Sequence, residues 1–398
     1  MDGLKGKNVL VGVTGGIAAY KVVDVISQLK KRGAEVFVIM TKEAQEFIKP
    51  LTFQTISQNL VITEMFSTPR TWEVEHISLA EKADVFLIAP ATANIIGKIA
   101  NGIADDMLTT TVIATKSKVV FAPSMNVNMF ENPITQRNLD ILRKAGYYII
   151  DPEEGLLACG DSGKGRLPST DTIIDELEYV LTKKDFKGKK ILVTAGPTQE
   201  AIDPVRFITN YSSGKMGYAI AKAGSNRGGE VVLITGPTYL QPPRRVKVVK
   251  VKSAVEMKEA VFKEFQEAEI IIKAAAVADY RPACIADQKI KKDDSNLKIE
   301  LVRNPDILAE LGRQKGNRIL VGFAAETQDI IKNARDKLVK KGLDMIIAND
   351  LTAEGSGFGT DTNIVQIITA NGEIKKYEKM GKIELAHIIL DKIFCLLS

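Results

Sequence analysis

The stretch from Asn8 to Gly33, NVLVGVTGGIAAYKVVDVISQLKKRG, decides the fold expected for the first half of the chain. Its apolar run 8–13 predicts a buried strand, and after Gly15-Gly16 the apolar residues recur at helical spacing until Gly33. A strand, a glycine turn and a helix open a nucleotide-binding α/β unit, because backbone N–H groups at the helix N-terminus attract a phosphate. A tight turn that binds no ligand fits this segment equally well.

The turn lacks the features of a dinucleotide site. Its glycines do not follow the pattern G-x-G-x-x-G, and the second apolar run, 35–40, continues into Thr41. A site for NAD would have an acidic residue there, to bind the ribose. The sequence therefore gives no support for NAD.

Three further apolar runs are predicted to be strands of the same sheet, at 84–89, 118–122 and 147–150. Each run leads into a segment that contains proline or glycine together with small polar residues. These segments cover 90–95, 123–130 and 155–167. Because the carboxyl ends of parallel strands share one edge of an open α/β sheet, we expect the three loops to share a ligand site.

The segment 155–167, GLLACGDSGKGRL, contains four glycines and places Cys159 near Lys164 and Arg166. So many permissive residues leave too little side chain for a packed element, which predicts a mobile loop instead of a regular strand. A loop that carries a thiol near cations is a candidate lid over an active site. The alternative is a surface loop with an incidental cysteine.

Two polar residues stand close to these loops in the sequence. His76 lies at or just before the helix that precedes the strand at 84, and Asn126 follows Pro123-Ser124. A lone histidine is more often a surface or capping residue than a catalyst, and an asparagine in this position also suits a helix cap. Neither residue identifies a site by itself.

A resemblance to a known family rests on five features taken together. They are GGIAA at 15–19, His76, PATAN at 90–94, PSMNVNMF at 123–130 and GLLACGDSGKGRL at 155–167. In order and spacing they resemble the flavin-dependent cysteine decarboxylases. They look more closely like the phosphopantothenoylcysteine decarboxylase half of the bifunctional proteins of bacterial coenzyme A biosynthesis. Thr92, Ile95 and Phe130 depart mildly from the family's motifs and leave the polar roles in place.

The resemblance implies an FMN site and three catalytic residues in the first half. The residues implied to bind FMN are Thr14, Gly15, Gly16, Ile17, Thr41, Thr92, Ala93, Asn94 and Ser124. In the family the flavin oxidises the cysteinyl thiol of phosphopantothenoylcysteine, which lets carbon dioxide leave, and then re-reduces the product. His76 would act as acid/base, Asn126 would anchor the carboxylate, and Cys159 would donate the last proton.

The second half starts after the charged segment KKDFKGKK at 183–190, whose lack of periodicity predicts a linker. The strands predicted beyond it are 191–194, 269–273, 319–321 and 344–348. Several of their carboxyl ends converge, as in the first half. The run KIKK at 289–292 could face them, although a charge run is usually a solvated surface.

This half also resembles a known family. The motifs that carry the resemblance are FITNYSSGKMG at 207–217, AAAVADYRP at 274–282, KIKK at 289–292, NPDIL at 304–308 and GFAAET at 322–327. They are similar to the phosphopantothenoylcysteine synthetase half of the same bifunctional proteins. The resemblance implies that CTP with Mg²⁺ converts 4′-phosphopantothenate to an acyl-cytidylate, releasing pyrophosphate, and that the amine of cysteine then displaces CMP.

Carried onto this chain, the resemblance assigns two catalytic residues and a nucleotide site. Asn210 would support attack on the acyl-cytidylate, and Lys289 would stabilise the charge that develops while it forms. The residues implied to bind CTP are Ala274, Ala275, Asp279, Lys289, Asn304, Pro305, Asp306, Ile307, Phe323, Lys337 and Lys341.

We therefore predict an α/β protein with two Rossmann-like domains. The first is a flavodoxin-like flavoprotein fold with a parallel sheet, and the second is a Rossmann-like sheet of the phosphopantothenoylcysteine synthetase type. With 398 residues the chain is long enough for two cores. We place a decarboxylase domain at 1–183, a linker at 184–189 and a ligase domain at 190–398.

The composition narrows the partners. A net charge of +5 is small and spread out, which suits anionic metabolites better than nucleic acid. The 3 cysteines lie far apart, which argues against a disulfide framework or a zinc site. No run reaches the ~20 apolar residues of a membrane span. We expect a cytoplasmic protein that binds neither nucleic acid nor membrane.

The resemblance further implies a homo-oligomer, with trimeric contacts between decarboxylase domains and dimeric contacts between ligase domains. Two other functions stay open. One is a flavin-binding regulatory protein that has lost decarboxylase activity, against which the complete set His76, Asn126 and Cys159 argues. The other is a Rossmann-like module that binds nucleic acid, which predicts an affinity that falls steeply with salt.

Overall fold

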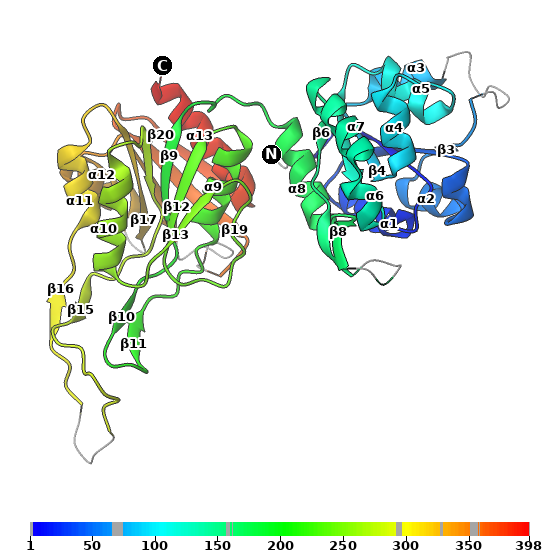
Figure 1. Ribbon diagram of the computed structural model, residues 1–398. Helices are drawn as coiled ribbons and strands as arrows, with labels where there is room; N and C mark the ends of the chain where they lie inside the picture. Colours follow the sequence, from blue (N-terminus) through cyan, green and yellow to red (C-terminus); the bar gives the residue numbers. More distant parts are fainter. Residues whose placement is uncertain are drawn as a thin grey trace. The chain divides into compact units, whose positions relative to one another are not determined.

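The computed structural model describes residues 3–65, 75–156, 160, 162–291, 297–326, 329–350, 357 and 359–397. The chain divides into two compact units, of which the first ends at Thr182 and the second begins at Lys183. In each unit, helices pack against both faces of a central sheet (Figure 1). No helix in the described ranges is long and apolar enough to cross a membrane.

The first unit is built on a parallel sheet. In the order of the sheet its strands are β3 (Val61–Ile62), β2 (Glu35–Met40), β1 (Asn8–Val13), β4 (Val85–Ala91), β5 (Lys118–Pro123) and β6 (Tyr148–Ile149). The strand order reverses between β1 and β4, where Val9 pairs with Val85. Ligands of open α/β sheets bind at the carboxyl ends of the strands beside such a reversal. The predicted parallel α/β fold is confirmed.

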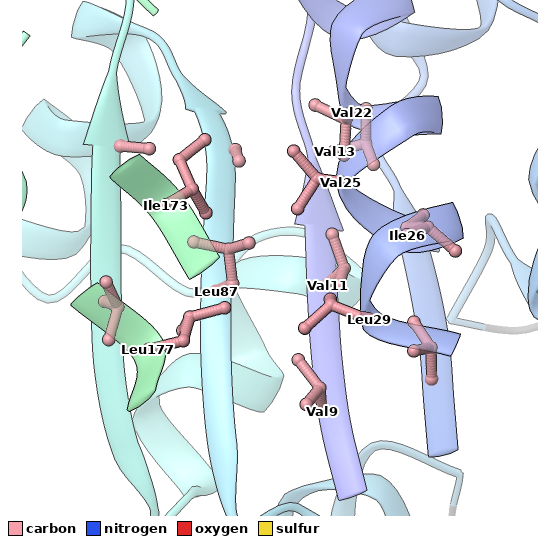
Figure 2. Packing of buried hydrophobic residues seen from close by; sticks show 14 of the residues in the cluster. Val9, Val11, Val13, Val22, Val25, Ile26, Leu29, Leu87, Ile173 and Leu177 are labelled. Carbon is pink, nitrogen blue, oxygen red and sulfur yellow. The ribbon is translucent and has the colours of Figure 1, made fainter. Parts of the chain in front are cut away.

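Helices cover both faces of this sheet. They are α1 (Ala19–Lys31), α2 (Pro50–Ser57), α3 (Glu75–Lys82), α4 (Ala93–Ala100), α5 (Met107–Ala114), α6 (Val127–Glu131), α7 (Pro133–Lys144) and α8 (Thr170–Leu181), with a 3₁₀ turn at Glu43–Glu46. Val9, Val11 and Val13 of β1 lie in one buried cluster with side chains of α1 and α8 (Figure 2). Leu10 lies in the cluster on the opposite face. This alternation follows from the two-residue period of a strand. β1 is therefore covered on both faces of the sheet.

The glycine-rich segment after β6 differs from its prediction. It contains β7 (Glu153–Leu156) and β8 (Ser162–Arg166), which pair antiparallel as a two-stranded sheet. The prediction of a mobile loop across 155–167 was therefore wrong for the paired residues. Gly155, Gly163 and Gly165 extend with φ of 155°, 159° and 152°, a region that glycine enters freely because it has no Cβ. Permissive backbone here builds strands instead of preventing them.

The second unit has a larger, mixed sheet. In the order of the sheet its strands are β13 (Lys247–Lys250), β12 (Glu230–Thr235), β9 (Lys190–Ala195), β14 (Ile270–Lys273), β17 (Ile319–Glu326), β18 (Met345–Asp350), β19 (Thr362–Thr369) and β20 (Ile374–Gly381). The strands from β13 to β18 run parallel, and β19 and β20 continue the sheet antiparallel. Its order reverses between β9 and β14, so this unit has a second candidate binding edge.

Two layers of helices enclose this sheet. They are α9 (Lys215–Asn226) and α13 (Lys382–Leu397) on one face, and α10 (Ala254–Phe265), α11 (Ile307–Gln314) and α12 (Ile330–Lys340) on the other. Two short ribbons, β10 (Gln199–Ala201) with β11 (Phe207–Thr209) and β15 (Tyr280–Pro282) with β16 (Leu301–Arg303), lie outside the sheet (Figure 1). Both ribbons are formed by loops that leave the carboxyl edge of the sheet.

Arg227 joins the start of the second unit to its last helix. Its guanidinium donates to both carboxylate oxygens of Asp185, at 2.8 and 2.7 Å, and to Asp391 at 2.6 Å. It also lies 4.8 Å from the ring centre of the buried Phe186. Residues 185 and 186, within the segment predicted as a linker, thus pack into the second unit.

His387 of α13 should make the second unit less stable in mild acid. Burial, together with the nearby Arg227 guanidinium, lowers the pKa of His387 to about 4. The unfolded chain takes up this proton near pH 6.5 and the folded chain only near pH 4, so stability falls as the pH drops through that window. We expect the free energy of unfolding to fall by about 2 kcal/mol between pH 7 and pH 5 from this group alone. Urea unfolding at both pH values should show that loss in the wild type and not in His387→Gln.

Candidate active sites

A cavity of about 900 Å³ lies at the carboxyl edge of the first sheet. Its lining comes from the segments that follow β1, β2, β4 and β5, together with the end of β8. The predicted FMN residues all line it: Thr14, Gly15, Gly16, Ile17, Thr41, Thr92, Ala93, Asn94 and Ser124. The structure thus brings this predicted set together in one site, large enough for a cofactor and a substrate.

The turn after β1 is shaped as an anion cradle. α1 begins at Ala19, and no side chain caps the N–H groups of its first turn. A Cβ added to Gly15 would lie 2.4 Å from Cβ of Glu43, so only glycine lets the two segments approach this closely. Uncapped N–H groups at a helix N-terminus attract a phosphate. These features fit the phosphate of FMN.

Thr14 and Thr92 connect the loops that follow β1 and β4, two neighbouring strands of the sheet. The Thr14 hydroxyl donates to the carbonyl of Pro90 at 2.6 Å, and the Thr92 hydroxyl accepts from the N–H of Ile95 as the cap of α4. Both side chains therefore have fixed positions before any ligand binds. The hydrogen bond from Thr14 to Pro90 holds the loop after β1 at a defined separation from the end of β4.

Asn126 lies at the edge of the same cavity. Its side-chain oxygen accepts from the N–H of Asn128 at 2.8 Å and caps α6. The loop that carries it is tied to β8, because the N–H of Met125 donates to the carbonyl of Gly165 at 2.9 Å. The cap explains how Asn126 is positioned, and the cavity shows that it faces the candidate cofactor site.

Two cations at this cavity were not among the predicted site residues. Lys21 and Arg166 both line it. Burial lowers the pKa of Lys21, the Arg166 charge lowers it further, and Glu153 opposes the shift. Lys21 lies in the first turn of α1, directly after the glycine turn. That position was a usable signal in the sequence.

The structure does not gather every residue predicted for the first site. His76 lies at the start of α3, as expected, but is not among the residues that line the cavity. Cys159 lies outside the described residues. The catalytic roles of both residues stay predictions.

A second cavity, of about 430 Å³, lies at the carboxyl ends of β14 and β17. Nine of the predicted CTP residues line it: Ala275, Asp279, Asn304, Pro305, Asp306, Ile307, Phe323, Lys337 and Lys341. Ala274 and Lys289 do not line it. Lys273 and Arg303 line it without having been predicted.

Asp306 organises one wall of this cavity. Its carboxylate accepts from the N–H of Ala309 at 3.0 Å as the cap of α11, and pairs with Lys341 at 3.1 Å. Burial opposes the ionisation of Asp306, but these two partners outweigh it and hold its pKa below the ordinary value. The start of α11 and the end of α12 are thereby joined across the cavity.

The side chain of Asn210 is hydrogen-bonded to the backbone next to this cavity. Its side-chain N–H donates to the carbonyl of Ala276 at 3.1 Å. Its side-chain oxygen is buried and accepts no hydrogen bond from the described residues. A buried acceptor without a donor is costly, so the oxygen is ready to accept a hydrogen bond from a ligand.

Lys289 is held by a turn of the chain far away in sequence. The buried carboxylate of Asp203 accepts from Arg206 and from the N–H of Ile290 at 3.2 Å, and Arg206 donates to the carbonyl of Ile290 at 2.8 Å. The N–H of Ala286 donates to Ile202 at 3.0 Å. Lys289 is exposed between these two attachment points. Arg206 and the backbone donors keep the pKa of Asp203 far below its ordinary value, so the attachment stays charged.

Comparisons with known proteins divide the chain near the boundary between the two compact units. A family model described as Flavoprotein matches residues 2–182, and one described as DNA/pantothenate metabolism flavoprotein C-terminal domain matches residues 186–396. The chain is 49% identical over 397 residues to the coenzyme A biosynthesis bifunctional protein CoaBC of Bacillus subtilis (strain 168), covering 99% of this chain and 98% of that protein.

Two further relatives bear the same name. The CoaBC protein of Vibrio cholerae serotype O1 is 46% identical, over 94% of both chains. A crystal structure of the C-terminal domain of a CoaBC protein is 45% identical and covers 54% of this chain and 98% of its own, with a TM-score of 0.48. With near-complete coverage at this identity, the chain belongs to the family of bifunctional coenzyme A biosynthesis proteins.

Proposed function

We propose that the chain catalyses two consecutive steps of coenzyme A biosynthesis. The second unit joins cysteine to 4′-phosphopantothenate with CTP, and the first unit decarboxylates the phosphopantothenoylcysteine to 4′-phosphopantetheine. The observation that carries the proposal is that each unit has a cavity at the carboxyl edge of its sheet, lined by most of the residues that the family motifs assign to that activity. The relatives over the full length are named as bifunctional proteins of coenzyme A biosynthesis.

In the first unit the chain's own residues would bind, orient and protonate the substrate. FMN, when bound, would supply oxidation of the cysteinyl thiol and the later reduction. The cradle after β1 would hold its phosphate, and Thr92 and Ser124 would contact the rest. Asn126 would bind the substrate carboxylate by its side-chain amide, His76 would exchange a proton with the substrate, and Cys159 would return one to the product.

In the second unit the reaction needs positive charge near the α-phosphate of CTP and a hydrogen-bond acceptor for the amine of cysteine. Lys289 would stabilise the charge that develops on the α-phosphate while the acyl-cytidylate forms and pyrophosphate leaves. The buried oxygen of Asn210 would accept a hydrogen bond from the attacking amine of cysteine. Mg²⁺ would enter with CTP and neutralise part of its triphosphate.

We also propose that the chain acts as a homo-oligomer. Ile17 and Tyr20, beside the flavin cavity, are 56% and 59% exposed, and an oligomer contact of the decarboxylase units would cover them. In the second unit Phe207 and Tyr211, on and beside the β10–β11 ribbon, are 48% and 93% exposed and suit a contact between ligase units. Exposed apolar side chains near a functional edge are typical of such contacts.

One assay tests the whole proposal. The purified protein is incubated with 4′-phosphopantothenate, cysteine, CTP and Mg²⁺, while pyrophosphate, product mass and the visible spectrum are followed. We expect a yellow protein that releases pyrophosphate and forms 4′-phosphopantetheine. Absence of pyrophosphate would contradict the ligase assignment, and accumulation of phosphopantothenoylcysteine in the presence of added FMN would contradict the decarboxylase assignment.

Cys159→Ser should stop decarboxylation after carbon dioxide is lost. A serine hydroxyl is a much weaker acid than a thiol, so the unsaturated thiol product would not be protonated and re-reduced. Mass spectrometry should find that oxidised product, together with a bleached flavin spectrum. CTP-dependent pyrophosphate release should be unchanged, and full turnover to 4′-phosphopantetheine would show that Cys159 is not the proton donor.

A further inference from the structure

Lys273 places an ammonium group where the fold calls for an apolar side chain. It is the last residue of β14 and only 8% exposed. The alternation along β14 puts Lys273 on the same face as Ile271, which lies in the apolar cluster with Leu311 and Leu320. Burying a charged group against such a surface costs free energy unless the group is paired. The position therefore calls for a compensating partner.

The protein does not supply that partner within the described residues. Lys273 forms no hydrogen bond or ion pair there, and its side chain lines the second cavity. Asp306 acts on its charge, but the Asp306 carboxylate is already engaged by Ala309 and Lys341. Burial lowers the pKa of Lys273 to about 8, and the charges of Lys341 and Lys337 act in the same direction. At neutral pH Lys273 is thus a cation that lacks a counter-charge.

The side chains that line the cavity carry an excess of positive charge. Among its described lining residues, Lys273, Arg303, Lys337 and Lys341 are cations, and Asp279 and Asp306 are the carboxylates. A concave site with an excess of positive charge concentrates anions. The ligand that completes this cavity should therefore bring negative charge to it.

We propose that Lys273 binds a phosphate oxygen of the nucleotide that occupies this cavity, an inference that rests on the proposed CTP-dependent ligation. An ammonium donating to a phosphate oxygen forms a charge-assisted hydrogen bond, which is about twice as strong as a neutral one. Because Lys273 is already desolvated, it loses little further hydration when the phosphate arrives. The affinity for the nucleotide therefore gains twice, because the unpaired Lys273 ammonium destabilises the empty cavity and its pairing with phosphate stabilises the complex.

The test replaces Lys273 by methionine, an unbranched side chain one atom shorter, which removes the charge. At pH 7 we expect calorimetry to show CTP affinity lower by at least about tenfold, with cytidine affinity unchanged because cytidine has no phosphate. The matched control is Lys332→Met, the same substitution at an exposed residue of α12 that does not line this cavity, and it should leave CTP affinity unchanged. Without ligand, Lys273→Met should melt at a higher temperature than the wild type, because it removes a buried unpaired charge.

A CTP affinity of Lys273→Met within twofold of the wild type would overturn the inference, as would equal losses for CTP and cytidine. Inorganic tripolyphosphate separates this inference from the proposed function. If the wild type binds tripolyphosphate through Lys273 but does not bind CTP, the ligase proposal fails and the role of Lys273 stands. If CTP binds and supports ligation equally well without the Lys273 charge, the ligase proposal stands and the role of Lys273 fails.

Discussion

Lys289→Gln should reduce CTP-dependent release of pyrophosphate by at least about 10²-fold, the loss typical when one donor to a developing charge is removed. Glutamine retains a hydrogen-bond donor of similar reach but has no charge to place near the phosphorus. Lys289 is exposed in the structure, so its loss should cost little folding stability. Pyrophosphate release with 4′-phosphopantothenate, CTP and Mg²⁺ is the measurement, and FMN should stay bound.

Lys291→Gln is the matched control for this prediction. It makes the same change of charge two residues away, in the same exposed segment, beyond Ile290, whose backbone is attached to Asp203 and Arg206. Of the two lysines, Lys289 alone lies between that attachment and the one at Ala286. We therefore expect pyrophosphate release by Lys291→Gln within about threefold of the wild type. Equal losses in both variants would mean that the segment contributes general positive charge, and no loss in either would refute the assignment of Lys289.

The sequence predicted best the parts of the fold that depend on local pattern. The strands at 8–13 and 35–40 have the predicted bounds, because a buried parallel strand is a continuous apolar run that ends abruptly at polar or glycine residues. The helices were harder to delimit. The helix expected between Gly16 and Gly33 spans Ala19–Lys31, because the ends of a helix leave a weaker signal than its apolar face.

Elements that depend on pairing between distant residues were missed or misjudged. The β7–β8 hairpin was taken for a mobile loop, because a glycine-rich strand has no side-chain period to reveal it. β19 and β20 were not predicted, although Asn371-Gly372 between them is a strong hairpin signal. Their antiparallel pairing adds two strands to the edge of the second sheet.

The candidate sites show the same limit. Motifs identified most of the residues that line both cavities, since the loops at strand ends carry the recognisable sequences. Lys273 was missed because it is the last residue of a strand, where a sequence pattern cannot tell a buried side chain from one that reaches a cavity. Asp203 was missed because its structural role depends on a hydrogen bond from Ile290, 87 residues away. Such residues become visible only when the chain is folded.

Gly165→Ala should remove most of the decarboxylase activity by disturbing the FMN cavity. A Cβ on Gly165 would lie 2.3 Å from the carbonyl oxygen of Met125, which is backbone and cannot rotate away. The φ of 152° adds strain for any residue with a Cβ. Either the loop carrying Ser124 and Asn126 or β8 must then shift, and both segments line the cavity. We expect FMN affinity to fall by about 10- to 100-fold, as 1–3 kcal/mol of strain would produce.

The control for this prediction is Gly155→Ala in the paired strand of the same hairpin. Gly155 has a nearly identical φ of 155°, but its added Cβ would approach only the Arg166 side chain, at 3.5 Å. The two variants therefore share the backbone strain and differ in the collision with Met125, so Gly155→Ala should lose clearly less FMN. Bound flavin is measured by absorbance, and CTP-dependent pyrophosphate release serves as a check that the second unit is intact. Equal flavin loss in both variants would attribute the effect to the strained hairpin, and full flavin content in Gly165→Ala would show that the loop at Met125 yields without affecting the site.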